Sequence, residues 1–331
     1  MCQDGALATY DVPATDEAFK DELFSDICDA HCHPHDDIAN LDLIPRLKTG
    51  HLTIMGVRQD DWDRVEEVAR KCNATGETKC IPCFGLHPWY THRVMTNESV
   101  DGTSQEHYDQ VLKTSVPEEK SDLIRCLPPP VPYAVWYADL HRRLLENPQA
   151  IVGEAGLDRS ARLLPGGMIE WHGVKPTTVQ CTIEHQLAIL GAQIDLAREL
   201  DRAVSIHCVQ AQGHLLQLLK SKGSKSSVRL CLHSYGGSPA TIAQFLHLRG
   251  FAVYVSFSIA INGRLTPKKL EALIQAVPHD RLLIESDLNS PLGLDENMEG
   301  IARIVAHARQ WSLDQAVRQT RDNWLKFVNM S

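Results

Sequence analysis

Short runs of apolar and β-branched residues alternate along the chain with longer segments whose apolar positions repeat at helical spacing. The short runs predict eight strands, at residues 27–33, 52–57, 81–87, 150–156, 203–208, 228–233, 251–257 and 281–287. The longer segments predict helices at residues 62–72, 134–146, 182–200, 213–221, 239–248, 266–277, 299–310 and 313–328. Strands that alternate with helices are typical of parallel sheets, so the pattern predicts an α/β fold, a single (β/α)8 TIM barrel. A doubly wound open sheet is the alternative.

Two strand-to-helix connections are longer than this pattern requires. One insertion covers about residues 91–149 and includes a proline-rich run, and the other covers about residues 160–177 after the fourth strand. In a barrel these connections surround the active-site mouth, so we expect both insertions to shape it. Residues 1–24, with one short helix at 15–23, are predicted to be an N-terminal extension, and residues 25–331 the barrel domain.

Charge and composition narrow the function classes. The 331 residues include 42 acidic and 33 basic side chains, a net charge of −9, and 43% are hydrophobic. This balance argues against broad adsorption to nucleic acid through a basic surface, but not against a nuclease whose positive charge comes from bound metal ions. No apolar run is long enough to cross a bilayer, and the N-terminus is acidic where a signal peptide is basic. We therefore expect a soluble protein of the cytoplasm or nucleus, with its ten cysteines reduced.

Six metal-binding side chains fall at the ends of five predicted strands. His31 and His33 end the first strand and point the same way because side chains alternate along a strand. The other four are Glu154, His207, His233 and Asp287, which end the fourth, fifth, sixth and eighth strands. The carboxyl ends of barrel strands converge, so we expect one shared metal centre. The alternative is six unrelated polar residues, each hydrogen-bonded to nearby backbone.

Six ligands are too many for one tetrahedral ion and too few to saturate two, which predicts two ions with open positions for water and substrate. On this hypothesis His31, His33 and Asp287 hold one ion, His207 and His233 hold the other, and Glu154 bridges a separation of about 3.5–4 Å. Glu154 and Asp287 are the predicted catalytic residues, with Asp287 accepting a proton from the attacking water. Imidazole and carboxylate ligands leave the metal open among Mg, Mn and Zn.

The same motifs resemble those of the TatD-type metal-dependent deoxyribonucleases, in the same order through the whole barrel. The resemblance implies a TIM barrel with two divalent ions that cleaves DNA phosphodiester bonds, often as a 3′-to-5′ exonuclease. It extends over about residues 27–328, apart from the insertions, and rests on these segments: Asp29-Ala30-His31-Cys32-His33, Gly85-Leu86-His87-Pro88, Gly153-Glu154-Ala155-Gly156-Leu157-Asp158, Ile206-His207-Cys208, His233-Ser234-Tyr235-Gly236-Gly237 and Glu285-Ser286-Asp287-Leu288-Asn289-Ser290-Pro291.

Three further residues are predicted to contact substrate or to support the ligands. His87 ends the third strand, and the resemblance implies that it contacts a substrate phosphate or the leaving group. Tyr235 is a candidate hydrogen-bond partner of the substrate, unless it only forms the turn into the next helix. Asp158 either positions a metal ligand or caps the following segment. Glu285 is expected to be structural, and His35 to lie in a solvated loop.

The sequence also departs from the family pattern near the mouth. Val209 stands where the family usually has an arginine, and Arg159 and Ser160 replace an aromatic pair. Because every ligand position is intact, we expect retained hydrolytic chemistry with a changed grip on the substrate. Arg159, Arg162, Trp171 and His172 would supply phosphate contacts and a stacking surface, or else form a solvated loop.

The leading hypothesis is therefore a metal-dependent phosphodiesterase with a DNA substrate that works by two-metal activation of water. No nucleotide cofactor is expected, because no glycine-rich phosphate loop is present. A small-molecule amidohydrolase or lactonase on the same barrel is the first alternative, although many such enzymes carry a modified lysine where this chain has Glu154. The second alternative is a protein-interaction role that uses the 91–149 insertion.

Overall fold

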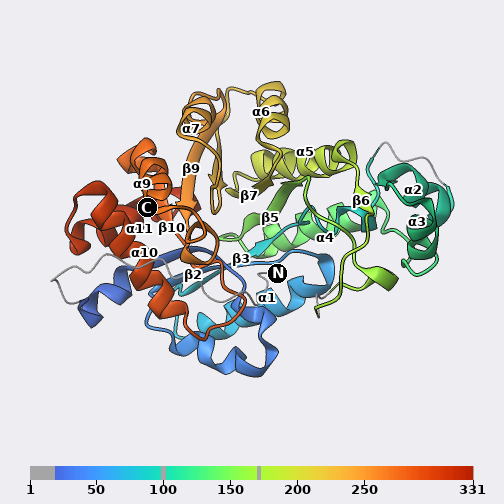
Figure 1. Ribbon diagram of the computed structural model, residues 1–331. Coiled ribbons are helices and arrows are strands. Elements are labelled where there is room, and N and C mark those ends of the chain that lie inside the picture. The colour runs from blue at the N-terminus through green and yellow to red at the C-terminus, as the bar shows by residue number, and fades with distance from the viewer. Residues whose placement is uncertain (1–18, 98–101, 170–172, 331) are drawn as a thin grey trace.

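The computed structural model describes residues 19–97, 102–169 and 173–330, and it confirms the predicted barrel. Eight parallel strands form one sheet in the order β1-β2-β3-β5-β7-β8-β9-β10 and stand at the centre of the molecule (Figure 1). Neighbouring strands in the sheet are also neighbours in the barrel sequence, which excludes the doubly wound alternative. The strands are β1 (Cys28–Cys32), β2 (His51–Met55), β3 (Cys80–Phe84), β5 (Ile151–Asp158), β7 (Val204–Val209), β8 (Val228–Leu232), β9 (Phe251–Phe257) and β10 (Leu282–Ile284).

The first and last strands meet along a seam of hydrogen bonds. The backbone N–H of Asp287 donates to the carbonyl of His31 over 3.0 Å, and that of His33 donates to Leu288 over 2.8 Å. Below them, the buried carboxylate of Asp29 accepts from the N–H of Ser286 at 3.0 Å and from its hydroxyl at 2.6 Å. The seam fixes the end of the first strand against the end of the last.

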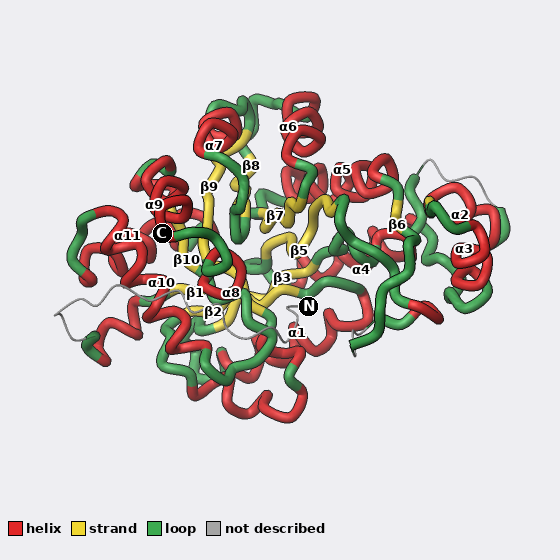
Figure 2. Tube along the Cα trace, in the orientation of Figure 1, coloured by secondary structure: helices red, strands yellow, loops and turns green. Residues whose placement is uncertain are grey.

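Helices cover the outside of the strands, as Figure 2 shows in red around yellow. The main apolar core lies between these helices and the strands. The helices are α1 (Gln59–Cys72), α4 (Tyr133–Glu146), α5 (Ile183–Glu199), α6 (Gln212–Ser221), α7 (Pro239–Leu246), α8 (Ile259–Asn262), α9 (Pro267–Ala276), α10 (Leu294–Arg309) and α11 (Leu313–Val328). Short 3-10 helices lie at Asp21–Asp26, Pro34–Asp36, Ile38–Arg46, Thr91–Arg93, Pro165–Gly167 and His279–Arg281. No helix in the part of the chain described combines the length and the apolar character needed to cross a membrane.

A second core fills the amino-terminal end of the barrel. Cys28, Ile81 and Leu283 from the strands pack there with Trp324 and Phe327 of α11, and all are buried. The indole N–H of Trp324 donates to the hydroxyl of Thr53 on β2 over 2.9 Å, so the polar edge of the buried ring is satisfied. This end of the barrel is closed by the C-terminal helix, which leaves the opposite end for chemistry.

The two insertions form one structural unit beside the barrel, where Figure 1 shows α2 and α3 next to β6. The first insertion contains α2 (Ser104–Val111), β4 (Leu112–Lys113) and α3 (Pro117–Ile124), none of which the sequence pattern predicted. Strand β4 pairs antiparallel with β6 (Gln180–Cys181), just after the second insertion. A small separate core contains Tyr108, Val111, Leu112, Leu123, Ile124 and Leu127 from the first insertion, with Leu163 from the second and Val179 directly after it.

Two buried histidine side chains hold the first insertion together and join it to helix α5 of the barrel. His107 of α2 contacts the carbonyl of His92 at 2.9 Å, and His185 of α5 contacts the carbonyls of Thr91 at 2.9 Å and Val94 at 3.1 Å. The rings of His107 and His185 meet edge to face with centroids 5.7 Å apart.

Most of the predicted N-terminal extension lies outside the described residues, so the division at residue 24 stays a prediction.

We predict that acid loosens this junction. Burial lowers the pKa of His185 to about 4, whereas an unfolded histidine has a pKa of about 6.5. Below pH 6.5 the unfolded chain therefore binds the proton more readily, and the free energy of unfolding falls as the pH drops towards 4. Between pH 7 and pH 5 this one histidine accounts for a loss of about 2 kcal/mol.

His185→Gln keeps an N–H donor but cannot titrate, so urea unfolding at pH 7 and pH 5 should show a smaller difference for this variant than for the wild type. His247→Gln alters an exposed histidine and serves as the matched control, with wild-type pH dependence expected. Equal pH dependence in all three proteins would contradict the assignment.

Candidate metal centre

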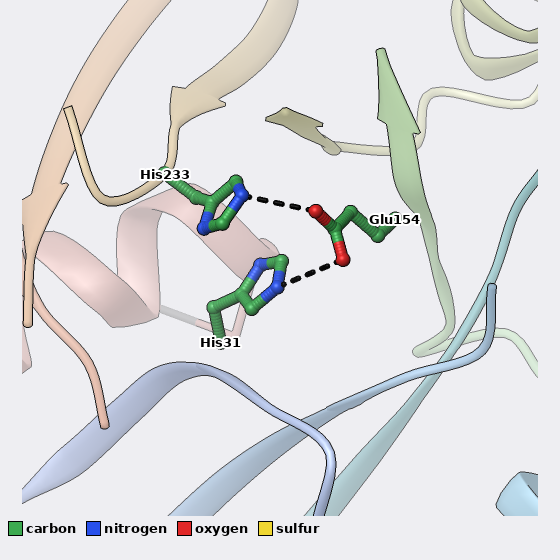
Figure 3. A group of neighbouring side chains, drawn as sticks. All are labelled: His31, Glu154 and His233. Carbon is green, nitrogen blue, oxygen red and sulfur yellow. Dashed lines mark ion pairs between the residues drawn. The ribbon is translucent and has the colours of Figure 1, made fainter. Parts of the chain in front are cut away.

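One buried carboxylate lies between two pairs of histidines at the carboxyl end of the barrel. Oε2 of Glu154 is 3.4 Å from Nε2 of His31 and 3.3 Å from Nε2 of His33. Oε1 of the same side chain is 2.8 Å from Nδ1 of His207 and 3.0 Å from Nε2 of His233. Figure 3 shows the two carboxylate oxygens directed to two different rings, those of His31 and His233. A carboxylate placed in this way is suited to bridge two cations.

Asp287 completes the group from the other side of the seam. Its Oδ1 lies 3.8 Å from Nε2 of His31 and 3.7 Å from Nε2 of His33. The backbone of Asp287 has a φ of 54°, a left-handed conformation that aspartate tolerates better than most residues. All six predicted ligands are thus brought together, and His31, His33 and Asp287 form one of three groups with metal-binding spacing among the described residues.

Each of the four histidines has its other ring nitrogen held by a neighbour. The contacts are His31 Nδ1 to the Ser205 hydroxyl at 2.8 Å, His33 Nδ1 to the Met55 carbonyl at 3.1 Å, His207 Nε2 to Asp158 at 3.4 Å, and His233 Nδ1 to Glu285 at 3.3 Å. A carbonyl or carboxylate accepts the proton of the outer nitrogen and leaves the inner nitrogen with its lone pair directed at the centre. This outer layer is the arrangement found around metal-ligating histidines.

An irregularity in β5 turns Glu154 towards this centre. Ile151 packs inside the barrel, while Val152, Ala155 and Leu157 pack against the outer helices. Regular alternation from Ile151 would point residue 154 outward, but the pairing register with β7 shifts between Val152 and Ala155. The strand pairing shifts in the same way between Asp29 and Cys32 of β1. Two of the ligand-bearing strands, β1 and β5, are therefore irregular near the ligands that they carry.

The charges in the centre depend on one another. Burial favours the neutral form of Glu154, but the imidazoles of His87, His233 and His31 outweigh burial and hold its pKa well below the usual range. Burial also favours neutral His33, yet the hydrogen bond and charge of Glu154 raise the pKa of His33 to about 9. The buried carboxylate thus requires positive charge around it, which protons or cations provide. The donor set fits divalent ions, and their binding would release protons.

His87 differs from the other histidines in the direction of its proton. Its Nδ1 accepts a hydrogen bond from the backbone N–H of Trp89 at 3.2 Å, so a neutral His87 carries its proton on Nε2. That Nε2 lies 3.3 Å from Oε1 of Glu154. Burial lowers the pKa of His87 to about 4, although the charge of Glu154 opposes that shift. His87 therefore presents an N–H donor to the centre rather than a lone pair.

Asp158 both contacts a predicted metal ligand and caps the segment that follows β5. Its Oδ2 accepts from the indole N–H of Trp89 at 2.7 Å and faces His207, while its Oδ1 accepts from the N–H groups of Ser160 and Ala161 at 2.7 and 3.0 Å. The hydroxyl of Tyr235 forms hydrogen bonds with the backbone of Ser238, so the ring supports the turn before α7. A substrate contact by Tyr235 stays a prediction.

The sequence interpretation missed two features near the centre. Glu285 accepts hydrogen bonds from the N–H and hydroxyl of Ser234 and from the hydroxyl of Ser256, and also contacts His233, so it positions a predicted ligand. The place of Glu285 two residues before Asp287, on the same strand face, predicted that it points into the barrel and needs a partner there, but not that the partner is His233. The expectation of a solvated His35 was wrong: the ring is fully buried, with both nitrogens lacking a hydrogen-bond partner among the described residues.

Of the four residues predicted to contact the substrate at the mouth, Trp171 and His172 lie outside the described residues, and Arg159 and Arg162 are exposed.

Comparisons with known proteins point to one family. The family described as TatD related DNase matches residues 28–329. The Cut9-interacting protein scn1 of Schizosaccharomyces pombe is 33% identical over 92% of this chain and 99% of its own length. An uncharacterized deoxyribonuclease of Saccharomyces cerevisiae is 29% identical over 91% of this chain and 99% of its own. The crystal structure of a TatD homologue from Escherichia coli K12 shares the fold, with a TM-score of 0.59 and 19% identity over 93% of this chain and 100% of that one.

We predict that Glu285 tunes metal affinity through His233. Glu285→Gln keeps the size of the side chain and its polar contacts but removes the charge that holds the outer nitrogen of His233. Loss of such an outer partner weakens metal binding roughly 10- to 100-fold. Competition with a chelator should measure this loss for Zn or Mn, with the exposed Glu77→Gln as control. Unchanged affinity together with a lower free energy of unfolding would assign Glu285 a purely structural role.

Proposed function

Because the chain belongs to the TatD-related DNase family, we propose that it is a metal-dependent deoxyribonuclease that removes nucleotides from the 3′ end of a DNA strand. One observation carries the proposal: the Glu154 carboxylate faces two separate sets of imidazoles, each held from outside by its own partner. The names of several relatives support the activity, since the Erwinia amylovora protein is named as a 3′-5′ ssDNA/RNA exonuclease.

The proposed ligand assignment follows the two oxygens of Glu154. His31, His33 and Asp287 would hold one divalent ion beside Oε2, and His207 and His233 would hold a second beside Oε1. When bound, such ions neutralise phosphate charge and acidify water near neutral pH. Mg, Mn and Zn all remain compatible with this mixture of imidazole and carboxylate groups.

Side chains of the site would carry out the proton transfers and hydrogen bonding of the proposed reaction. Asp287 would accept a proton from the attacking water, because its carboxylate stands at the edge of the centre beside His31 and His33. His87 would donate its Nε2 proton in a hydrogen bond to a phosphate oxygen or to the departing oxygen. Trp89 and Asp158 would orient His87 and His207, since each contacts one of these rings.

A protein-binding role is a second proposal. The Schizosaccharomyces pombe relative is named for its interaction with Cut9, and the unit formed by the two insertions stands beside the barrel (Figure 1). Such binding would not need the metal centre, so it would survive Glu154→Ala, which separates the two functions. We also propose a cytoplasmic or nuclear location, as expected from the sequence.

We predict that Glu154→Ala and Asp287→Ala each abolish metal-dependent hydrolysis. Each variant loses interactions that provide several kcal/mol of transition-state stabilisation, which corresponds to a fall in kcat/KM on the order of 1,000-fold or more. Glu77→Ala, which removes an exposed carboxylate before β3, should keep wild-type activity. Circular dichroism should show that all three variants are folded. Full activity in either site variant would refute the assignment.

A metal add-back experiment tests the substrate class. Chelation should remove activity, and Mg, Mn or Zn should restore progressive shortening of end-labelled single-stranded or double-stranded DNA from the 3′ end. Elemental analysis of the purified protein before chelation gives the metal and its stoichiometry. Inactivity on DNA together with turnover of a lactone or amide would favour the amidohydrolase alternative.

A further inference from the structure

A cavity of about 260 Å³ lies between the loop after β3 and the loop after β5. Trp89 and Arg93 form one wall, Leu164 and Met168 form another, and Leu127 contributes from the end of the first insertion. The cavity is therefore built by both insertions together. Its volume lies just below the range of roughly 300–1,000 Å³ that is typical of pockets for drug-sized ligands, so it suits a small ring system.

The cavity borders the metal centre, because Asp158 and Trp89 line the cavity and also contact histidines of the centre. The carboxylate of Asp158 lines the cavity and also faces Nε2 of His207 at 3.4 Å. The indole N–H of Trp89 donates to that carboxylate over 2.7 Å, and the backbone N–H of Trp89 donates to His87. A substrate whose phosphate occupies the centre would thus have its neighbouring group at the entrance of the cavity.

The lining favours an uncharged aromatic group. Most of the walls are apolar, Trp89 is half-buried with its ring fixed by Asp158, and Met168 is 41% exposed although it is hydrophobic. The two arginines already bind backbone carbonyls: Arg93 donates to Gly167 over 2.7 Å and Arg162 donates to Ser160 over 2.8 Å. They stabilise the walls, which leaves an aromatic and apolar interior beside a centre that binds phosphate.

We propose that this cavity is a nucleobase subsite, which holds the base of the 3′-terminal nucleotide while its phosphodiester lies at the metal centre. The proposal rests on the proposed nuclease function. A base can stack on an exposed aromatic ring whatever its sequence, but it must first leave its own stack. The subsite therefore selects an unpaired strand end, and it makes the two insertions part of substrate recognition.

The test compares two single-stranded oligonucleotides that differ only in the base of the 3′-terminal nucleotide, one natural and one abasic. Wild-type protein should prefer the natural end by roughly 5- to 100-fold in kcat/KM, the range that stacking of one base provides. Ala161→Trp fills the cavity from a wall residue whose contact with Asp158 comes from its backbone, so that contact is retained. In this variant the ratio should fall close to one. Leu164→Trp repeats the test from another position on the lining.

The matched control is Ala74→Trp, in the exposed turn after α1 at the amino-terminal end of β3, and it should keep the wild-type ratio. Equal cleavage of both oligonucleotides by the wild type, or an unchanged ratio in both cavity-filling variants, would overturn the subsite and leave the nuclease function intact. Failure of the wild type to cleave either oligonucleotide would instead overturn the nuclease function, and the subsite with it.

Discussion

The structure depends on the seam where the barrel closes. The carboxylate of Asp29 is fully buried, and burial raises its pKa to about 7, although hydrogen bonds from Ser286 and His31 oppose that rise. Those bonds tie the first strand to the last at the level of the site. They support the direct backbone hydrogen bond from Asp287 to His31, two residues that are far apart in sequence. A polar contact inside the scaffold thus sets the geometry of the groups above it.

The site is built in layers around one buried carboxylate. The innermost layer is the carboxylate of Glu154, which is only 4% exposed and has imidazoles on both sides. Around the imidazoles lies a layer of fixed acceptors and hydroxyls, including Glu285, Asp158 and Ser205. Buried charges are costly unless every one is paired, so this completeness explains how such a dense polar group exists inside a barrel. The two insertions add a final layer at the mouth.

Much of the fold and of the site could be predicted from the local sequence pattern. The features that could not be predicted have physical causes. Strand and helix order follows from the apolar periodicity, and the convergence of Glu154 with His207 follows from their places at strand ends. The inward direction of Glu154 depends on a register shift in β5, which regular alternation does not reveal. The pairing of Leu112 with Cys181 joins segments far apart in sequence, and no short-range signal marks it. The burial of His35 likewise depends on tertiary packing.

The antiparallel pairing of β4 with β6 has an evolutionary consequence. Each insertion contributes to one small core, in which Tyr108 and Leu123 of the first pack in the same cluster as Leu163 of the second. Neither segment has enough apolar surface to fold without the other. A lineage that lost one of them would expose the apolar side chains of its partner, so we expect the two segments to be inherited or lost together.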